Sequence, residues 1–428
     1  MKIIILGAGI SGISAAYHLK EAGFDSIIYE KANSWGGLCD NFVIDGFRFD
    51  TFIHLSFTEE RYVRDLFAES VQSQVHIPHP LNYYKGHWLK HPVQNNLFHL
   101  DIEEKIKIIV DFINRVDTSS EDIIDNYEEW LRVQFGNYFA ENFPLVYTRK
   151  YWTVDADELE TRWIGGRMYL PTIEEVLEGA MTSDTPNTYY AKEMRYPIKG
   201  GYKSFINNMA LDANIHLKSE ITRINLETKE IEINGRQIEK FDWLISSLPL
   251  PEIVRLIDNV PDIVREASKK LKWTSGAIIS LGFNKPDIPR CLWFYIYDED
   301  ILTSRIYSPS IKSRDNVPDG CSSIQGEIYF SQEKPLEKEI STLLEDEIEN
   351  YVHMGLFTKD DLIVKDIRIE QYANVIFNHE IYDSRKIIRE YLEQQGIITI
   401  GRFGEWDYFW SDQSLLSGKE GAEKWLKK

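Results

Sequence analysis

The sequence has 428 residues, of which 43% are hydrophobic and 27% are charged, a balance typical of folded globular proteins and not of disordered chains. A chain of this length predicts two or three domains. Lys and Arg number 48 against 68 Asp and Glu, so the net charge of −20 argues against general nucleic-acid binding through phosphate neutralisation.

The first predicted element is a short buried strand at residues 2–6, and a glycine-rich loop follows it directly. The loop reads Gly7-Ala8-Gly9-Ile10-Ser11-Gly12, and a helical pattern continues through residue 19. In a dinucleotide-binding fold, the first glycine makes the tight turn, the second lets the backbone approach a pyrophosphate, and the third packs helix against strand. A second strand ends at Glu30, about 20 residues after the loop, where an acid can bind a ribose.

This loop alone does not distinguish an FAD-binding domain from an NAD-binding domain. It could also arise from chance glycines in an unrelated α/β unit. Glu30-Lys31 is followed by Gly36-Gly37-Leu38 and, after a further strand-like stretch, by His54. Paired glycines at this distance let the backbone approach a second part of a long dinucleotide, which an NAD-only domain does not need. The stretch resembles the FAD-binding flavoproteins of the amine oxidase and protoporphyrinogen oxidase superfamily, and within it the UDP-galactopyranose mutases, especially the eukaryotic type.

Two positions depart from the pattern of that family. Ser34 stands where an arginine often precedes the glycine pair, and Phe52-Ile53 stands where a glycine-containing pair usually precedes the histidine. By the resemblance, the second change falls in the backbone that would lie beside the flavin. If Phe52-Ile53 closed the flavin face, the chain could be a flavin-binding protein without enzymatic activity.

The middle of the chain changes its periodicity twice. Residues 58–181 are mostly helical in pattern, with helices expected at 101–116 and 120–134, whereas residues 216–247 alternate with a period of two. Aromatic-rich strands between residues 273 and 371, with one helix at 336–354, predict an antiparallel sheet beneath a substrate. The expected fold is therefore α/β, with three parts: a Rossmann-like FAD-binding domain (1–57, 190–265 and 390–428), an inserted helical lobe (58–189) and a mostly antiparallel β-sheet substrate domain (266–389).

The C-terminal segment looks like a second cofactor-binding element. A strand at 397–400 leads into Gly401-Arg402, and Asp412-Gln413-Ser414 opens a helical pattern. Alone, this could be an ordinary strand-to-helix connection. In the resembled family, however, the glycine and arginine approach FAD, the helix borders the flavin, and a strand at the place of Ile221 faces the adenine. The resemblance implies a cofactor site made of Gly7, Gly9, Ile10, Ser11, Gly12, Glu30, Lys31, Gly36, Gly37, Leu38, His54, Ile221, Gly401, Arg402, Asp412, Gln413 and Ser414.

Two arginines lie in segments that resemble the substrate-binding parts of the mutases. Arg167 ends a Trp-Ile-Gly-Gly-Arg run, and Arg305 follows Trp293 and Tyr295 at the spacing of that family. Arginine suits a diphosphate because its fork donates paired hydrogen bonds. The resemblance implies His54, Arg167 and Arg305 as catalytic residues, and a substrate site made of Arg167, Trp293, Tyr295, Arg305, Tyr372 and Tyr408.

Each of these residues also has a plainer interpretation. Arg167 could form a surface salt bridge on a helix, and Arg305 could pair with a neighbouring carboxylate. His54 could be a satisfied core histidine. Most of the 23 tyrosines of the chain are expected to be packing residues.

No nucleophile with its base and no metal cluster is evident in the sequence, which fits chemistry carried by a cofactor. The resemblance implies an FAD-dependent mutase acting on a nucleotide sugar, such as the conversion of UDP-galactopyranose to UDP-galactofuranose, through attack of reduced flavin N5 on the anomeric carbon. The FAD would be active when reduced, with NAD(P)H as one source of electrons. The alternatives are an FAD-dependent oxidoreductase of the same superfamily and a nicotinamide dehydrogenase that uses the N-terminal loop alone.

The cysteines and the hydropathy indicate the cellular location of the protein. Cys39, Cys291 and Cys321 have neither metal-ligand spacing nor a disulfide framework, which favours a reducing, cytoplasmic location. No apolar run reaches the roughly 18 residues of a membrane-spanning helix, so we expect no membrane insertion. The expected partner is a small nucleotide-sugar substrate and not nucleic acid. The sequence leaves open whether the chain forms a homo-oligomer.

Overall fold

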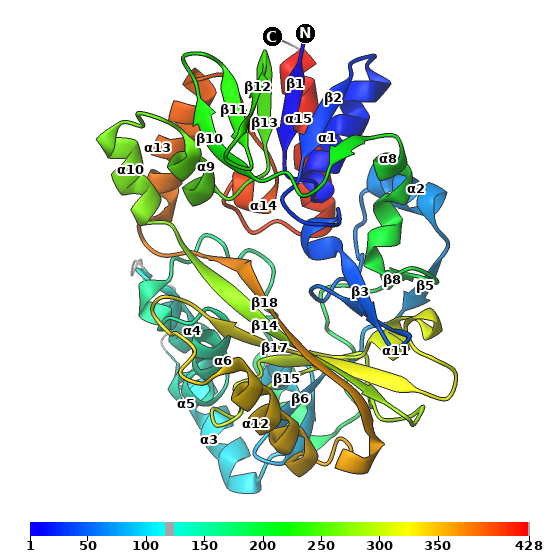
Figure 1. Cartoon of the computed structure of the whole chain (residues 1–428). Coiled ribbons are helices and arrows are strands. Elements are labelled where there is room, and N and C mark those ends of the chain that lie inside the picture. Colours follow the sequence, from blue (N-terminus) through cyan, green and yellow to red (C-terminus); the bar gives the residue numbers. More distant parts are fainter. Residues whose placement is uncertain (116–123, 427–428) are drawn as a thin grey trace.

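A parallel sheet forms the end of the molecule at which both termini lie (Figure 1). The computed structural model describes residues 1–115 and 124–426. Within this part of the chain, β1 is the middle strand, and its four residues are fully buried. In spatial order the five parallel strands are β19 (Ile397–Thr399), β13 (Trp243–Ser246), β1 (Ile3–Leu6), β2 (Ser26–Tyr29) and β9 (Asn214–His216).

The two ends of the chain pack together beside this sheet. Helix α1 (Ile10–Glu21) contacts α15 (Ser411–Leu426), the C-terminal helix of the described chain. Gly418 makes the approach possible, because a Cβ there would lie 2.2 Å from the carbonyl oxygen of Ser11. The N-terminal and C-terminal segments therefore lie side by side at this end of the molecule.

Smaller elements complete this end of the molecule. The strands β10, β11 and β12 form an antiparallel sheet, and α10 packs on α13 beside them. Their bounds, with those of the neighbouring short elements, are β10 (Ile221–Asn225), β11 (Glu230–Ile233), β12 (Gln237–Lys240), α9 (Leu250–Leu256), α10 (Asp262–Lys269), α13 (Ile381–Gln394), α14 (Gly401–Gly404), α2 (Arg61–Ser70), α8 (Asn207–Leu211), β3 (Asn41–Ile44), β4 (Phe47–Asp50), β5 (Ser73–His76) and β8 (Met194–Pro197).

A second, seven-stranded sheet crosses the middle of the molecule (Figure 1). Its neighbouring strands are antiparallel except for the parallel pair β15 and β6. This confirms the predicted, mostly antiparallel sheet. In spatial order the strands are β18 (Leu362–Ile376), β14 (Lys272–Phe283), β17 (Ser322–Phe330), β16 (Arg305–Tyr307), β15 (Trp293–Ile296), β6 (Leu81–Tyr84) and β7 (His87–Lys90).

Helices cover this sheet on the side away from the parallel sheet. The helices α3 to α6 form a lobe at one end, and α12 lies beneath the strands (Figure 1). The bounds are α3 (Ile102–Ile113), α4 (Tyr127–Phe135), α5 (Asn137–Asn142), α6 (Pro144–Tyr151), α7 (Ile173–Met181), α11 (Pro309–Lys312) and α12 (Ile340–His353). Within the described residues, no helix has the length and apolar character needed to cross a membrane.

The segment 58–189 differs from the helical expectation between residues 73 and 90. It contributes β5, β6 and β7. The strand β6 pairs with β15 and β7 pairs with β6, which completes the seven-stranded sheet. The helix expected at 120–134 begins at Tyr127, and residues 116–123 of the two expected helices lie outside the described part of the chain. The domain division at residues 58, 190, 266 and 390 stays a prediction.

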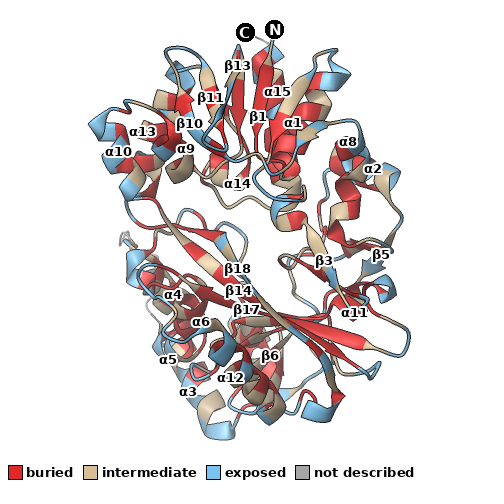
Figure 2. Cartoon of the chain, viewed as in Figure 1, coloured by how far each residue is buried: buried red, intermediate tan, exposed pale blue. Residues whose placement is uncertain are grey.

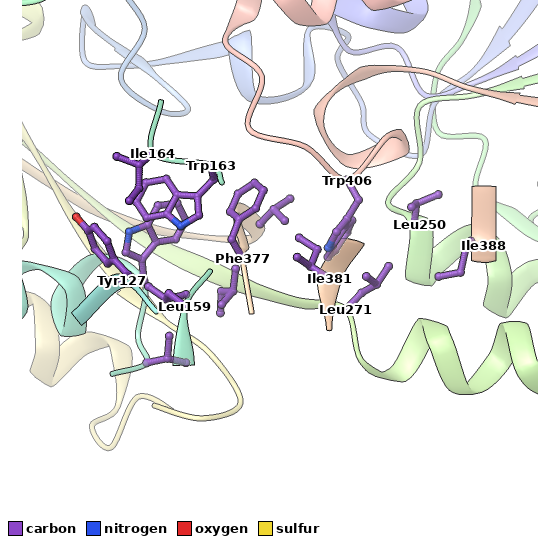
Figure 3. Packing of buried hydrophobic residues seen from close by; sticks show 14 of the residues in the cluster. Tyr127, Leu159, Trp163, Ile164, Leu250, Leu271, Phe377, Ile381, Ile388 and Trp406 are labelled. Atoms are coloured by element: carbon purple, nitrogen blue, oxygen red, sulfur yellow. The ribbon is translucent and has the colours of Figure 1, made fainter. Parts of the chain in front are cut away.

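One cluster of buried hydrophobic residues extends from the parallel sheet into the helical lobe. Buried residues are red in Figure 2. Figure 3 shows the junction, where Trp163 lies next to Phe377 and Trp406 lies on the other side of Phe377. The ring centroids of Trp163 and Phe377 are 6.0 Å apart. Large aromatic rings dominate the energetics of such a core. This cluster fixes the two segments that carry Arg167 and Tyr408.

Candidate active site

A cavity of about 1430 Å³ lies between the two large sheets. The glycine loop, the segment after β2, α6, the turn before α7, β15, β16, the end of β18 and the start of α15 all contribute to its wall. The structure thus brings most of the predicted site residues to one place. On the wall are Gly7, Gly9, Ile10, Ser11, Glu30, Lys31, Gly36, Gly37, Leu38, His54, Arg167, Ile221, Trp293, Tyr295, Arg305, Tyr372, Gly401, Arg402, Tyr408 and Ser414.

Three predicted cofactor residues, Gly12, Asp412 and Gln413, are not part of the wall. A Cβ on Gly12 would lie 2.0 Å from the carbonyl oxygen of Gly7, so Gly12 serves close packing of helix against loop, the role expected for the third glycine. Asp412 and Gln413 lie in the first turn of α15. Gln413 accepts a hydrogen bond from the backbone N–H of Trp410 at 2.9 Å.

The N-terminus of α1 and the glycine pair form a cradle. Gly9 is the N-cap of the helix, and a Cβ on it would meet no described atom within 4 Å. The N–H of Gly36 donates to the carbonyl of Ala8 at 2.8 Å, and a Cβ on Gly37 would lie 3.2 Å from the Cα of Gly9. Free helix N–H groups beside open space are suited to a pyrophosphate.

Two further contacts bring Glu30 and the C-terminal segment next to this cradle. The Glu30 carboxylate accepts hydrogen bonds from the N–H groups of Ala8 at 2.8 Å and Ala32 at 2.9 Å, which places it beside the loop where a ribose acid is needed. Gly401 has a φ of +78°, and a Cβ on it would lie 2.2 Å from Ser11 Oγ. The C-terminal segment therefore lies directly on the start of α1. These residues fit a long dinucleotide.

His54 lies on the wall, and Phe52 does not. The His54 Nδ1 is 3.0 Å from the carbonyl oxygen of Phe52, and its ring lies 4.9 Å from that of Tyr202. The Phe52 ring is 7% exposed and packs into the core of the seven-stranded sheet with Tyr329 and Ile278. Phe52 therefore does not line the cavity, whereas Ile53 does. A flavin-binding protein without activity stays an untested alternative.

Burial lowers the pKa of His54 to about 4, from the usual 6.5. The folded protein then holds neutral His54 at pH values where the unfolded chain binds a proton. The free energy of unfolding should therefore fall as the pH falls from 6.5 toward 4. We expect His54 to lower the free energy of unfolding by about 1–2 kcal/mol when the pH falls from 6.5 to 5.

Urea unfolding at several pH values measures this contribution, with His54→Asn as the comparison. The variant should show a shallower pH dependence in this window. Burial also lowers the pKa of His91, to about 3. His91 should therefore contribute equally to the pH dependence of both proteins. Equal slopes for the two proteins would contradict the assignment.

Arg167 and Arg402 lie over the same tyrosine ring. Their guanidinium carbons are 4.6 and 5.0 Å from the centroid of Tyr408. Arg167 donates to the carbonyls of Trp163 at 2.7 Å and Tyr408 at 3.2 Å. Arg402 donates to Asn374 Oδ1 at 2.7 Å and to the carbonyl of Phe409 at 3.3 Å.

No carboxylate of the described chain pairs with either of these two arginines. The Nε of each is buried without a hydrogen-bond acceptor among the described residues. Arg167 lies in a turn and not on the expected helix, and no surface salt bridge holds it within the described chain. Buried donors without acceptors call for an acceptor-rich ligand.

Arg305 has a different environment from these two. Its Nε and Nη2 donate to one carboxylate oxygen of Glu327 at 2.9 and 2.6 Å, and the Glu327 side chain is fully buried. The plainer interpretation, pairing with a neighbouring carboxylate, is therefore what the structure shows. Arg305 still lines the cavity, but Glu327 balances its charge.

The predicted tyrosines and tryptophan have mixed roles. The Tyr372 hydroxyl donates to Glu252 Oε1 at 2.9 Å, and its ring stacks on Trp273. The Tyr295 ring lies 4.8 Å from that of His91. The indole nitrogen of Trp293 is buried and has no acceptor among the described residues.

Sequence reasoning missed two tyrosines of α6 that also line the cavity. The Tyr147 hydroxyl is buried without a described partner, and the Tyr151 hydroxyl lies 3.2 Å from Asn374 Oδ1 and 3.4 Å from the hydroxyl of Tyr408. Their i, i+4 spacing, which places both on one helix face, was the available signal.

The sequence between residues 10 and 326 matches the family described as flavin containing amine oxidoreductase. The chain belongs to this family. It is therefore a flavin-dependent enzyme of an oxidoreductase family, and FAD is its cofactor, as predicted. The glycine cradle, Glu30 and Gly401 are the residues that would hold it.

The fold is also similar to solved structures of this superfamily. A crystal structure of reduced UDP-galactopyranose mutase matches with a TM-score of 0.94 and 24% identity, covering 100% of this chain and 95% of that chain. Putrescine oxidase with bound putrescine matches with a TM-score of 0.65 and 13% identity, covering 100% of both chains. These matches confirm the predicted fold class.

Curated relatives match over a short stretch only. The 4,4'-diaponeurosporene oxygenase of Staphylococcus haemolyticus is 49% identical over 49 residues, which is 11% of this chain and 10% of that protein. The zeta-carotene-forming phytoene desaturase of Myxococcus xanthus is 41% identical over 49 residues, with the same two coverages. The chain thus matches about a tenth of the length of these relatives.

Proposed function

We propose that the protein is an FAD-dependent mutase that acts on a nucleoside diphosphate sugar. One observation carries the proposal: Arg167 and Arg402, without carboxylate partners in the described chain, lie over Tyr408 in a protein of net charge −20. Two uncompensated guanidiniums in a cavity form a local positive site that attracts a diphosphate. The similarity in fold to reduced UDP-galactopyranose mutase supports UDP-galactopyranose and UDP-galactofuranose as the first pair to test.

The side chains can bind and position such a substrate. The arginines donate paired hydrogen bonds to the diphosphate and stabilise its charge when its bond to the sugar breaks. Tyr147, Tyr151 and Tyr295 form an aromatic wall that excludes water and fixes the orientation of the sugar. His54, neutral near pH 7, adds no charge to the flavin side. Reduced FAD, when bound, supplies the nucleophile for the anomeric carbon.

An FAD-dependent oxidoreductase is the second candidate. The family match and the similarity to carotenoid desaturases favour it, and an aromatic wall also suits an apolar substrate. This function would give no role to two charged arginines without counter-ions. It should also require an electron acceptor for turnover, whereas the mutase reaction is redox-neutral.

Titration of the FAD-loaded, dithionite-reduced protein with UDP tests the proposal. We expect saturable binding, and chromatography after incubation with UDP-galactopyranose should show a second UDP-sugar without consumption of reductant. No UDP binding in either redox state would contradict the proposal and favour the oxidoreductase. The cytoplasmic location, NAD(P)H as the reductant and a homo-oligomeric state stay predictions.

A further inference from the structure

Two arginines on the cavity wall, Arg305 and Arg402, have acceptors of different charge. Arg305 donates to the buried carboxylate of Glu327. Arg402 donates from Nη2 to the side-chain oxygen of Asn374 at 2.7 Å. Asparagine has nearly the same shape as aspartate, but its amide carries no charge. The side chain of Asn374 can therefore orient the guanidinium of Arg402 without acting as its counter-ion.

The backbone of β18 holds Asn374 firmly, just after an irregularity in the strand. In the register of β14 and β18, Thr274 pairs with Asn374, whereas Gly276 pairs with Glu370, so β18 has extra residues between these pairs. Such bulges redirect side chains and are common next to active sites. The N–H of Asn374 donates to Thr274 Oγ1 at 3.1 Å, and the residue is 4% exposed. Asn374 thus has one fixed place beside the cavity.

The hydrogen bonds also fix which way the amide of Asn374 points. A guanidinium only donates, so the amide oxygen must face Arg402. The same oxygen lies 3.2 Å from the hydroxyl of Tyr151, which lies 3.4 Å from the hydroxyl of Tyr408. Arg402 and Arg167 both lie over the ring of Tyr408. Asn374 therefore belongs to the network that holds the two arginines, although sequence reasoning did not predict it.

The amide nitrogen of Asn374 is buried and has no acceptor among the described residues. A buried donor without a partner is costly. An aspartate at this position would have no such donor and would form a charge-assisted pair with Arg402. The neutral side chain at position 374 is therefore explained by what it leaves available, which is a guanidinium without a counter-ion.

We propose that Asn374 is a positioning residue that orients Arg402 toward the diphosphate and keeps the site positively charged. The amide accepts one hydrogen bond from the guanidinium, and the ligand supplies the negative charge. The proposal rests on the proposed function, because it needs a diphosphate bound at Arg167 and Arg402.

Asn374→Asp tests the role of charge, because it places a carboxylate beside Arg402 and hardly changes the shape of the side chain. At neutral pH we expect the reduced, FAD-loaded variant to bind UDP at least about tenfold more weakly than the wild type, with FAD content unchanged. The affinity should also depend less steeply on ionic strength, because the local positive charge is smaller. A purely structural role would leave this salt dependence as it is. Calorimetric titration with UDP at several salt concentrations measures both effects.

Asn225→Asp is the matched control. The Asn225 side chain accepts from the N–H of Thr228 at 3.0 Å, a contact that a carboxylate also makes, and Asn225 is not on the cavity wall. This variant has the same net charge as Asn374→Asp, and its UDP affinity should change less than about twofold.

Asn374→Leu tests the role of orientation and decides the matter if Asn374→Asp does not fold. It keeps the approximate volume but removes the acceptor of Arg402. We expect UDP to bind about fivefold more weakly, with the salt dependence of the wild type, because no charge is added. UDP affinity equal to that of the wild type would contradict a positioning role.

The outcomes separate this proposal from the proposed function. If Asn374→Asp bound UDP as tightly as Asn225→Asp, the proposal would be overturned and the diphosphate site would stand. Loss of FAD from folded Asn374→Asp would assign Arg402 to the cofactor and would also overturn it. Wild-type protein that does not bind UDP in either redox state would overturn the proposed function and this proposal together.

Discussion

Replacement of Gly9 with valine is expected to abolish FAD retention while the apoprotein stays folded. Gly9 has a φ of −74°, which any residue can adopt, and a Cβ there meets no described atom within 4 Å. The side chain would instead occupy the space beside the α1 N-terminus that a pyrophosphate needs. Loss of several charge-assisted contacts predicts an affinity lower by about a thousandfold, or ~4 kcal/mol.

Gly12→Val is the matched control, because the same change three residues later has a different consequence. A Cβ on Gly12 would lie 2.0 Å from the carbonyl oxygen of Gly7, so this variant should lose stability even without cofactor. Flavin absorbance and the melting temperature of the apoprotein distinguish the two effects. Full FAD occupancy in folded Gly9→Val would contradict the cradle.

The cradle was predictable because its determinants are local. Each glycine of the loop has a backbone or packing role that follows from a strand, a tight turn and a helix in sequence. The strands β6 and β7 were not predictable in the same way. They have four residues each. The strand β6 joins the seven-stranded sheet only by pairing with β15, more than 200 residues away, and β7 joins it through β6. Periodicity in the chain carries no information about such a partner.

The substrate side of the cavity shows the same limit. Arg305 was recognised by its spacing from Trp293 and Tyr295, but its partner Glu327 depends on the register of β16 and β17. The charge available to a ligand therefore could not be read from the sequence. Arg402, expected to contact only the cofactor, lies over Tyr408 together with Arg167. The positive site thus comes from two chain segments that are brought together by the core around Trp163 and Trp406.

Replacement of Arg167 with alanine is expected to weaken UDP binding at least a hundredfold, or about 3 kcal/mol, with FAD content unchanged. The guanidinium bonds only to backbone carbonyls among the described residues, so its removal leaves no buried carboxylate without a partner. The loss should therefore appear in binding and not in folding. Calorimetric titration of the reduced holoenzyme with UDP measures it.

Arg162→Ala is the control, because it removes a neighbouring positive charge without touching the cavity. Arg162 is about three-fifths exposed and pairs with Glu160 at 2.6 Å, so its loss should change UDP affinity less than twofold.

Arg305→Ala is a poorer test, because it would leave Glu327 buried and unpaired, at a cost of about 3–5 kcal/mol in stability. If Arg167→Ala bound UDP as tightly as Arg162→Ala, the diphosphate would have to lie elsewhere. The unpaired guanidinium of Arg167 would then need another acceptor-rich ligand.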